Sequence, residues 1–272
     1  MNNNVIKIIF FGDLVGKPGR FAVRDFLAKN SPKYDFVIAN IENASHGFGL
    51  TEKNYNDILE YGVDAMTCGN HIWDKKDIYS YIDNADKLVR PINYPAGTRG
   101  LGSRIYEKNG FKIGVINVLG RVFMNLVDSY WEQVKEEIEK IKQITPVVVI
   151  DFHAEATAEK ICFAKYCSEF GVSVFIGTHT HVQTADESII NNMAYVTDVG
   201  FCGASEGVIG MDYSTSLNRF LTGIPERYEV AEGEVSQINA IEVDININTG
   251  HALALKRINC SNSIIEENGD EN

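Results

Sequence analysis

Five short apolar runs, separated by segments with helical spacing, constrain the fold of this chain more than any other feature. The first run, Val5–Gly12, is rich in β-branched residues and lacks polar alternation, which is typical of a strand buried on both faces. The other four runs are Tyr34–Asn40, Val63–Cys68, Pro146–Phe152 and Val172–Ile176. Strands that alternate with helices in this way indicate an α/β fold.

Helices are predicted between these strands, and β-hairpins are predicted for the last third of the chain. The expected helices are Phe21–Lys29, Thr51–Tyr61, Asp77–Ala85, Ser129–Lys142 and Thr157–Phe170, with a turn at Gly16-Lys-Pro-Gly-Arg20. Further strands are expected at Ser103–Tyr106, Phe111–Leu119, Ala194–Asp198, Arg227–Glu232, Glu234–Asn248 and Ala252–Ile258. Two packed sheets with helices outside satisfy this pattern. We expect one domain over residues 1–260 and an acidic, disordered tail over residues 261–272.

The charge balance and the cysteines limit the partners and the compartment of the protein. The formal net charge is −12, so the surface repels nucleic acid and anionic membranes at long range. No stretch approaches the roughly 18 apolar residues of a membrane span. The five cysteines are odd in number and show no CxxC spacing, which is typical of reduced thiols. We therefore expect a cytoplasmic protein with no membrane contact and no stable nucleic-acid complex.

Side chains that bind metals or move protons stand at or directly after the ends of the five predicted strands. These residues are Asp13, Glu42, Asn43, Asn70, His71, His153, His179 and His181. Ligands of open α/β sheets bind at the carboxyl ends of the strands, so we expect these side chains to converge. Oxygen and imidazole donors without thiolate suit manganese, iron, zinc or cobalt. The set exceeds what one four-coordinate ion needs and fits two ions that share a carboxylate.

Taken alone, each of these residues also has an ordinary structural role open to it. Asp13 could cap a helix, and Asn43 and Asn70 could be turn residues. His179 and His181 are a stronger signal, because residues i and i+2 of an extended segment share a face. The coincidence of all these residues at equivalent strand ends favours a metal site.

Longer segments around these residues resemble the calcineurin-like metallophosphoesterases, and most closely their bacterial YmdB-type subgroup. The matching segments are Gly12-Asp13, Ile41-Glu-Asn-Ala-Ser-His-Gly-Phe-Gly-Leu50, Gly69-Asn-His-Ile-Trp-Asp-Lys-Lys76, Arg90-Pro-Ile-Asn-Tyr-Pro95, Asp151-Phe-His153-Ala-Glu-Ala, Gly177-Thr-His-Thr-His-Val-Gln-Thr-Ala-Asp186, Thr197-Asp-Val-Gly200 and Gly210-Met-Asp212. The resemblance extends from about Lys7 to Ile258. It implies a four-layer αββα sandwich of two mixed sheets flanked by helices.

The resemblance also implies how the ligands divide between two ions. One ion would take Asp13, Glu42, Asn43 and His181, and the other would take Glu42, Asn70, His153 and His179. The wider family usually begins with an Asp-x-His pair, which this chain lacks, and has aspartate where Glu42 stands. Both departures are those of the YmdB-type subgroup, with Asn43 in place of the missing histidine. His71 would donate a proton or stabilise the transition state.

From the subgroup we expect a phosphodiesterase acting on cyclic nucleotides, of the 2′,3′-cyclic or cAMP type, by attack of metal-bound hydroxide. The resemblance implies two transition-metal ions per chain, with iron or manganese favoured over zinc or cobalt, and a homo-oligomer. A phosphomonoesterase on the same site and a nucleotide-responsive regulatory protein with low turnover stay open as alternatives. The role of His46 is open between lining the pocket and supporting the loop.

Overall fold

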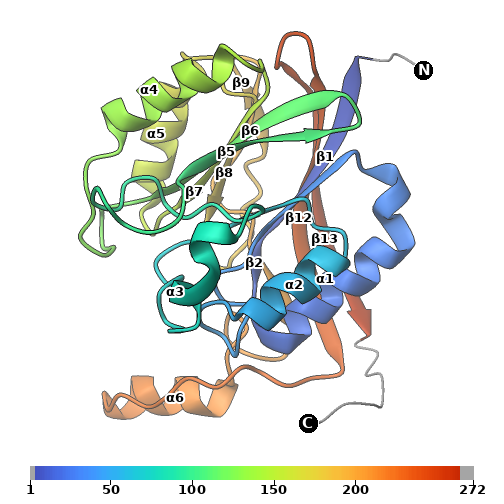
Figure 1. Ribbon diagram of the computed structural model, residues 1–272. Coiled ribbons are helices and arrows are strands. Elements are labelled where there is room, and N and C mark those ends of the chain that lie inside the picture. Colours follow the sequence, from blue (N-terminus) through green and yellow to red (C-terminus); the bar gives the residue numbers. More distant parts are fainter. Residues whose placement is uncertain (1–3, 264–272) are drawn as a thin grey trace.

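The computed structural model describes residues 4–263, which form two β-sheets packed face to face (Figure 1). The first sheet contains β1 (Val5–Phe11), β2 (Asp13–Leu14), β3 (Phe36–Asn40), β4 (Ala65–Thr67), β11 (Phe201–Ala204), β12 (Val235–Asn246) and β13 (Ala252–Ser263). Its order is β2-β11-β12-β1-β3-β4, and β13 also pairs with β12. The sheet is mixed, because β1 lies parallel to β3 and antiparallel to β12.

The second sheet has the order β5-β6-β7-β8-β10-β9. Its strands are β5 (Ser103–Lys108), β6 (Phe111–Leu119), β7 (Val148–His153), β8 (Val174–Thr178), β9 (Ser188–Ile190) and β10 (Met193–Val196). The helices are α1 (Gly16–Asn30), α2 (Glu52–Glu60), α3 (Ile78–Tyr81), α4 (Trp131–Lys142), α5 (Thr157–Ser168) and α6 (Tyr213–Thr222), with 3-10 turns at Ser31–Lys33 and Ile82–Asn84. No helix in this described part is long and apolar enough to cross a membrane.

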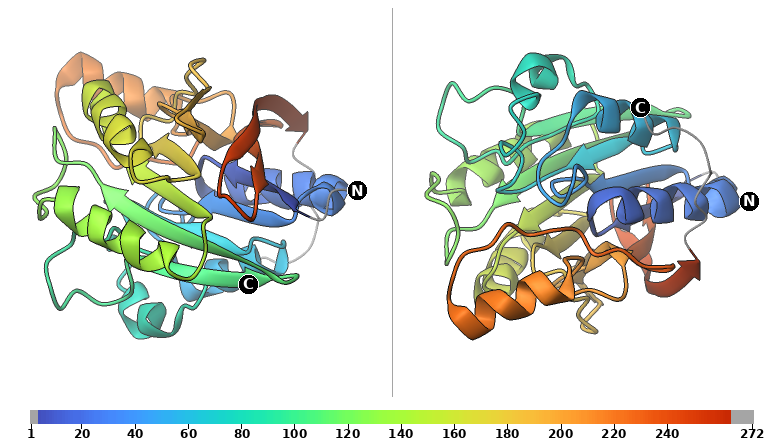
Figure 2. Two further views of the ribbon diagram at one scale, coloured as in Figure 1. Left: turned by 90° about the horizontal axis from the view of Figure 1, so that it is seen from above. Right: turned by 90° about the horizontal axis from the view of Figure 1, so that it is seen from below.

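Three apolar layers alternate with the two sheets and explain the unbroken hydrophobic strands. In β1, Ile8 and Phe10 face the second sheet, whereas Ile9 and Phe11 face the outer helices. Successive side chains of a strand point to opposite faces, so a strand covered on both sides needs apolar residues at every position. Figure 2 shows α1 and α2 outside the first sheet and α4 and α5 outside the second. The predicted αββα sandwich is therefore confirmed.

The strands that carry the predicted ligands run parallel within each sheet. β1, β3 and β4 are parallel neighbours in the first sheet, and β7 and β8 are parallel neighbours in the second. Their carboxyl ends therefore lie at one edge of each sheet. The two edges meet, since Glu42 after β3 contacts His153 at the end of β7.

Several predicted elements were wrong or displaced. Helix α1 begins at Gly16 rather than after a turn, since Pro18 is tolerated in the first turn of a helix. Arg227–Glu232 forms no strand and makes a single isolated bridge, Met211 to Val230. Helix α6 was not predicted. Strand β13 extends to Ser263, three residues into the segment expected to be a tail, and the rest of that tail lies outside the described residues.

Candidate metal centre

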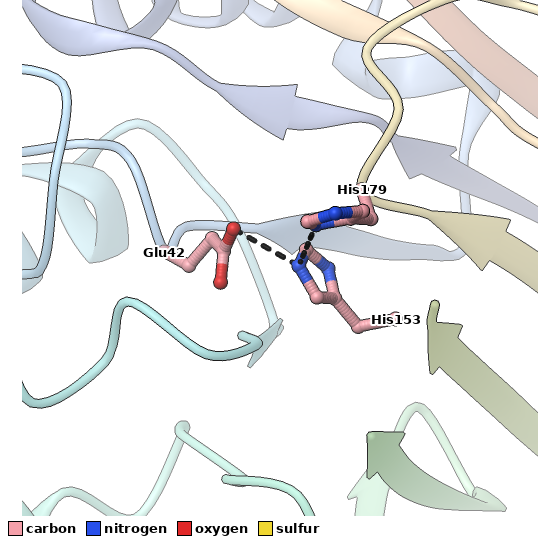
Figure 3. Close-up of side chains that lie close together, drawn as sticks. All are labelled: Glu42, His153 and His179. Atoms are coloured by element: carbon pink, nitrogen blue, oxygen red, sulfur yellow. Dashed lines mark hydrogen bonds and ion pairs between the residues drawn. The ribbon is translucent and has the colours of Figure 1, made fainter. Parts of the chain in front are cut away.

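Glu42, His153 and His179 bring their donor atoms together between the two sheets (Figure 3). The Nε2 atom of His153 lies 3.0 Å from Oε1 of Glu42 and 3.0 Å from Nδ1 of His179. All three donor atoms lie within 4.8 Å of one another, and Glu42 and His153 are buried. Convergent carboxylate and imidazole donors of this kind can hold a transition-metal ion.

The surroundings of His153 leave its Nε2 atom as the nitrogen that could bind a metal. The hydroxyl of Thr178 donates to Oδ1 of Asp151 at 2.7 Å, so the same hydroxyl accepts from Nδ1 of His153 at 2.9 Å. When the ring is neutral, as metal binding requires, its proton stays on Nδ1, and Nε2, which faces Glu42, has the lone pair. Such an outer hydrogen bond is the usual way in which a ligating histidine is oriented.

Outer hydrogen bonds select one nitrogen in the other two histidines as well. Nδ1 of His181 lies 2.8 Å from the carbonyl oxygen of Ile209, which leaves Nε2 of that ring for a metal. Nε2 of His179 lies 3.0 Å from Oε2 of Glu155, which leaves Nδ1. Each ring therefore keeps one nitrogen for an ion while a protein oxygen holds the other.

Three of the predicted oxygen ligands have buried atoms without a hydrogen-bond partner. These atoms are Oδ1 of Asp13, Oδ1 of Asn43 and Oδ1 of Asn70. The amide nitrogen of Asn43 donates to the carbonyl of Gly47 at 2.8 Å, so the orientation of its free oxygen is set. A buried oxygen without a partner costs about 1–3 kcal/mol, which a bound cation would offset. The residues present therefore fit the metal ions that the donor chemistry implies.

The pKa shifts of the metal-free site show how closely its charges interact. Burial alone would raise the pKa of Glu42, but the charge and hydrogen bond of His153 outweigh burial and lower it to about 2. Burial would lower the pKa of His153, but Glu42, Asp13 and Asp151 raise it to about 9. Burial raises the pKa of Asp13 well above its usual value, and burial together with the charge of His153 lowers the pKa of His179 to about 3. The protonated ring of His153 thus supplies, in the metal-free site, the positive charge that bound metal ions would supply.

His179 and His181 do not lie in an extended segment. The prediction that they share a face of a strand as residues i and i+2 is therefore wrong. Their φ angles are 102° and 62°, in the left-handed region that non-glycine residues seldom adopt. Ile209, which binds His181, has φ 48°, although it is β-branched. Strain of this kind persists only where the surroundings enforce it, and here it aims the two imidazoles.

A buried ion pair braces the loop that carries these histidines. Nζ of Lys160 lies 2.6 Å from Oδ2 of Asp198, and both side chains are only 1% exposed. The same carboxylate oxygen accepts the backbone N–H of Thr180 at 3.0 Å, between the two histidines. Lys160 and Asp198 thereby fix the backbone of the loop without contacting the cavity.

His71 lies beside the site and is held by two hydrogen bonds. Its backbone N–H donates to Oε2 of Glu42 at 3.1 Å, and its Nδ1 lies 2.8 Å from Oδ2 of Asp74. The ring packs edge-on against Phe48, with centroids 4.7 Å apart. His46 behaves differently, because it is exposed and lines a neighbouring cavity with Lys17.

An open cavity of about 380 Å³ lies over the donor atoms. Its polar lining is Glu42, Asn43, His71, Glu155, His179, Thr180, His181 and Ser216. Its other lining is Phe48, Val208, Ile209, Met211, Phe220 and Tyr228. The volume is within the range of small-molecule sites.

Several of these contacts had not been predicted. Asp74 stands three residues after the predicted His71, a spacing that could have marked it as the partner of that histidine. Glu155 follows His153 by two residues but contacts His179, so local spacing would not have identified its partner. The lining residues of α6 carry no comparable signal, since that helix itself had been missed.

Known proteins resemble this chain over nearly its whole length. The profile of the family described as YmdB-like protein matches residues 9–258. A protein of Bacillus subtilis (strain 168) named 2′,3′-cyclic-nucleotide 2′-phosphodiesterase is 44% identical over 256 residues, covering 93% of this chain and 96% of that protein. A crystal structure described as a novel phosphatase of Mycoplasma pneumoniae has TM-score 0.88 and 36% identity, covering 96% and 95% of the two chains. A crystal structure of a hypothetical protein from Thermus thermophilus has TM-score 0.88 and 36% identity, covering 94% and 99%.

Proposed function

The chain belongs to the YmdB-like protein family, and from this premise we propose that it is a dinuclear metal-dependent phosphodiesterase acting on cyclic nucleotides, with 2′,3′-cyclic nucleotides as the first candidates. The substrate follows the name of the Bacillus subtilis relative. One observation carries the chemistry: Glu42, His153 and His179 converge, and three more predicted ligands present buried oxygens without partners. The protein is an enzyme of the phosphoesterase class.

The proposed ligand sets share the carboxylate of Glu42. Asp13, Glu42, Asn43 and His181 would hold one ion, and Glu42, Asn70, His153 and His179 would hold the other, with iron or manganese favoured. Bound together, the ions would supply positive charge for the phosphoryl oxygens and acidify a water molecule. The hydrogen bonds to Thr178 and to the Ile209 carbonyl orient His153 and His181, so the donors need little rearrangement.

His71 is the proposed proton donor to the leaving oxygen. It lines the cavity, and its Nδ1 is engaged by Asp74, so Nε2 is the nitrogen available to substrate. The carboxylate of Asp74 holds the ring of His71 in position through this contact, as an orienting group does beside a general acid. Asp74 is thus a positioning residue in this proposal.

A pair of nitrophenyl esters tests whether diesters are the substrates. The metal-loaded protein should hydrolyse bis-p-nitrophenyl phosphate faster than p-nitrophenyl phosphate, and it should convert a 2′,3′-cyclic nucleotide into a nucleoside monophosphate. Faster hydrolysis of the monoester would favour the phosphomonoesterase alternative. A protein that retains its metals and hydrolyses neither ester would favour a regulatory role.

The proposal includes a cytoplasmic location and assembly into a homo-oligomer. The five cysteines, all in the described part of the chain, form no disulfide, which suits a reducing compartment. Phe123 and Leu126 are 88% and 93% exposed on one loop, where a second copy could cover them. Light scattering of the purified protein should give a mass above that of one chain.

A further inference from the structure

We propose that Phe48, Phe220 and Tyr228 form a subsite for the base of the nucleotide substrate, an inference that rests on the proposed function. These three rings line the same cavity as Glu42 and His71. The subsite would make the enzyme selective for nucleoside phosphodiesters over diesters that lack an aromatic ring.

The cavity lining is of two chemical kinds. Part of it consists of proposed metal ligands, and another part consists of three aromatic rings together with Val208, Ile209 and Met211. A phosphate group is satisfied by the metal ligands and gains nothing from aromatic rings. The substrate should therefore have an apolar, flat part attached to its phosphate, which a purine or pyrimidine base provides.

Phe48 and Tyr228 form the fixed part of the subsite. Their ring centroids lie 6.1 Å apart, and Phe48 also packs against His71 at 4.7 Å. The guanidinium of Arg219 lies 4.1 Å from the centroid of Tyr228, and it donates to the carbonyl of Glu226 at 2.6 Å. These contacts fix the rings of Phe48 and Tyr228 before substrate binds and link them directly to the proposed proton donor.

Phe220 is the part of the subsite that substrate would cover. It belongs to α6, which lies at the periphery of the molecule (Figure 1). The side chain lines the cavity and is nevertheless 84% exposed. Leaving a phenyl ring in water gives up the stabilisation of about 25 cal/mol per Å² of buried apolar surface. A base bound in the cavity would cover one face of this ring.

Stacking of a base on an aromatic side chain tolerates every base, because each base has a π face. The subsite should thus favour nucleotides in general rather than one base. Removing one stacking ring should weaken binding roughly 5- to 150-fold, the range typical of a base stacked on an aromatic side chain.

Two cyclic diesters with the same reacting ring test the subsite. Adenosine 2′,3′-cyclic phosphate carries a base, whereas glycerol 1,2-cyclic phosphate does not. In the metal-loaded protein, Phe220→Ala should lower kcat/KM for the adenosine compound by the factor above, mainly through KM. The same variant should change kcat/KM for the glycerol compound less than about twofold, and Phe220→Tyr should retain activity on both.

Leu221→Ala is the matched control, because Leu221 is 75% exposed on the same helix and does not line the cavity. It should leave both substrates unaffected. Equal losses on both substrates in Phe220→Ala, or equal losses in the two variants, would overturn the subsite.

A binding measurement separates the subsite from the proposed function. Titration of adenosine 5′-monophosphate and of ribose 5-phosphate into the metal-loaded protein requires no turnover. Phe220→Ala should weaken only the binding of the first ligand. If the protein turns over no diester, the proposed function fails, yet this selective loss would still support the base subsite. If both ligands bind alike to the unmodified protein, the subsite is refuted whatever the activity.

Discussion

Replacing Lys160 by methionine should show how much the buried Lys160–Asp198 ion pair stabilises the loop of His179 and His181, without changing any proposed ligand. Lys160 lies in α5, and its ammonium group is 2.6 Å from Oδ2 of Asp198. Asp198 accepts two backbone N–H groups, from Thr180 at 3.0 Å and from Gly200 at 2.9 Å. Methionine is similar in length to lysine, so the main loss is the charge that neutralises the buried carboxylate.

The expected loss of stability follows from this burial. Removing one partner of a buried ion pair costs about 3–5 kcal/mol, because the other charge stays desolvated and unpaired. With about 2.1 cal/mol/K of unfolding entropy per residue, 272 residues give roughly 0.57 kcal/mol/K, so Tm should fall by about 5–9 °C. Calorimetry of the metal-free variant and the metal-free parent measures this difference without a contribution from bound metal.

The brace should also matter for metal affinity, since Thr180 lies between His179 and His181. Losing an outer contact of a ligating group typically weakens metal binding 10- to 100-fold. The double variant Lys160→Met with Asp198→Asn removes both charges and keeps an oxygen that can accept the Thr180 N–H. It should recover most of the lost Tm. A single variant that melts with the parent, or a double variant no more stable than the single, would refute this reasoning.

Three further predictions concern the ligands and the proton donor. Glu42→Ala should leave less than one metal equivalent per chain by elemental analysis, since in the proposed site one carboxylate serves both ions; full metal content would show that Glu42 does not bridge. His71→Gln should keep its metals and lose on the order of 10²–10⁴ in rate on a cyclic nucleotide, with a much smaller loss on bis-p-nitrophenyl phosphate, whose leaving group needs no proton. Equal losses on both substrates would point to charge stabilisation instead. In the metal-free protein the pKa of His153 is raised to about 9, so the contribution of that ring to stability is complete below its unfolded pKa, about 6.5, and is lost as the pH rises through about 9. Urea unfolding should therefore give a lower unfolding free energy at pH 9 than at pH 6.5, and an increase across that interval would contradict the assigned pairing with Glu42.

Much of the fold could be predicted because its signals are local. Unbroken apolar runs such as Val5–Gly12 indicated strands covered on both faces. The helix predicted from Thr51 is α2, and the side chain of Thr51 caps it by accepting the backbone N–H of Asn54. Helix α6 was missed although Asp212 caps its start and Gly223, with φ 68°, ends it. Most of its large apolar side chains stay exposed, so its pattern lacks the buried stripe by which a helix is normally identified.

The sequence could predict which strand ends contribute residues to the site, but not the conformation of the loops that carry them. Parallel strands bring their carboxyl ends to one edge, and this rule alone led to Glu42 and His153, which the structure places in contact. The backbone conformation of His179 and His181 depends on contacts with distant parts of the chain. One of them is the hydrogen bond between His181 and the carbonyl of Ile209, which lies 28 residues further along the chain. No local pattern encodes left-handed conformations at these two positions, and none encodes the contribution of Phe220 in α6 to the cavity lining.

The most direct test of the central claim combines metal analysis with turnover on one preparation. We predict about two equivalents of transition metal per chain and conversion of a 2′,3′-cyclic nucleotide into a nucleoside monophosphate. Chelation should remove the metal and the activity together, and adding manganese or iron back should restore both. Full activity after the metal has been stripped, or a protein with both ions bound that cleaves no phosphodiester, would contradict the account.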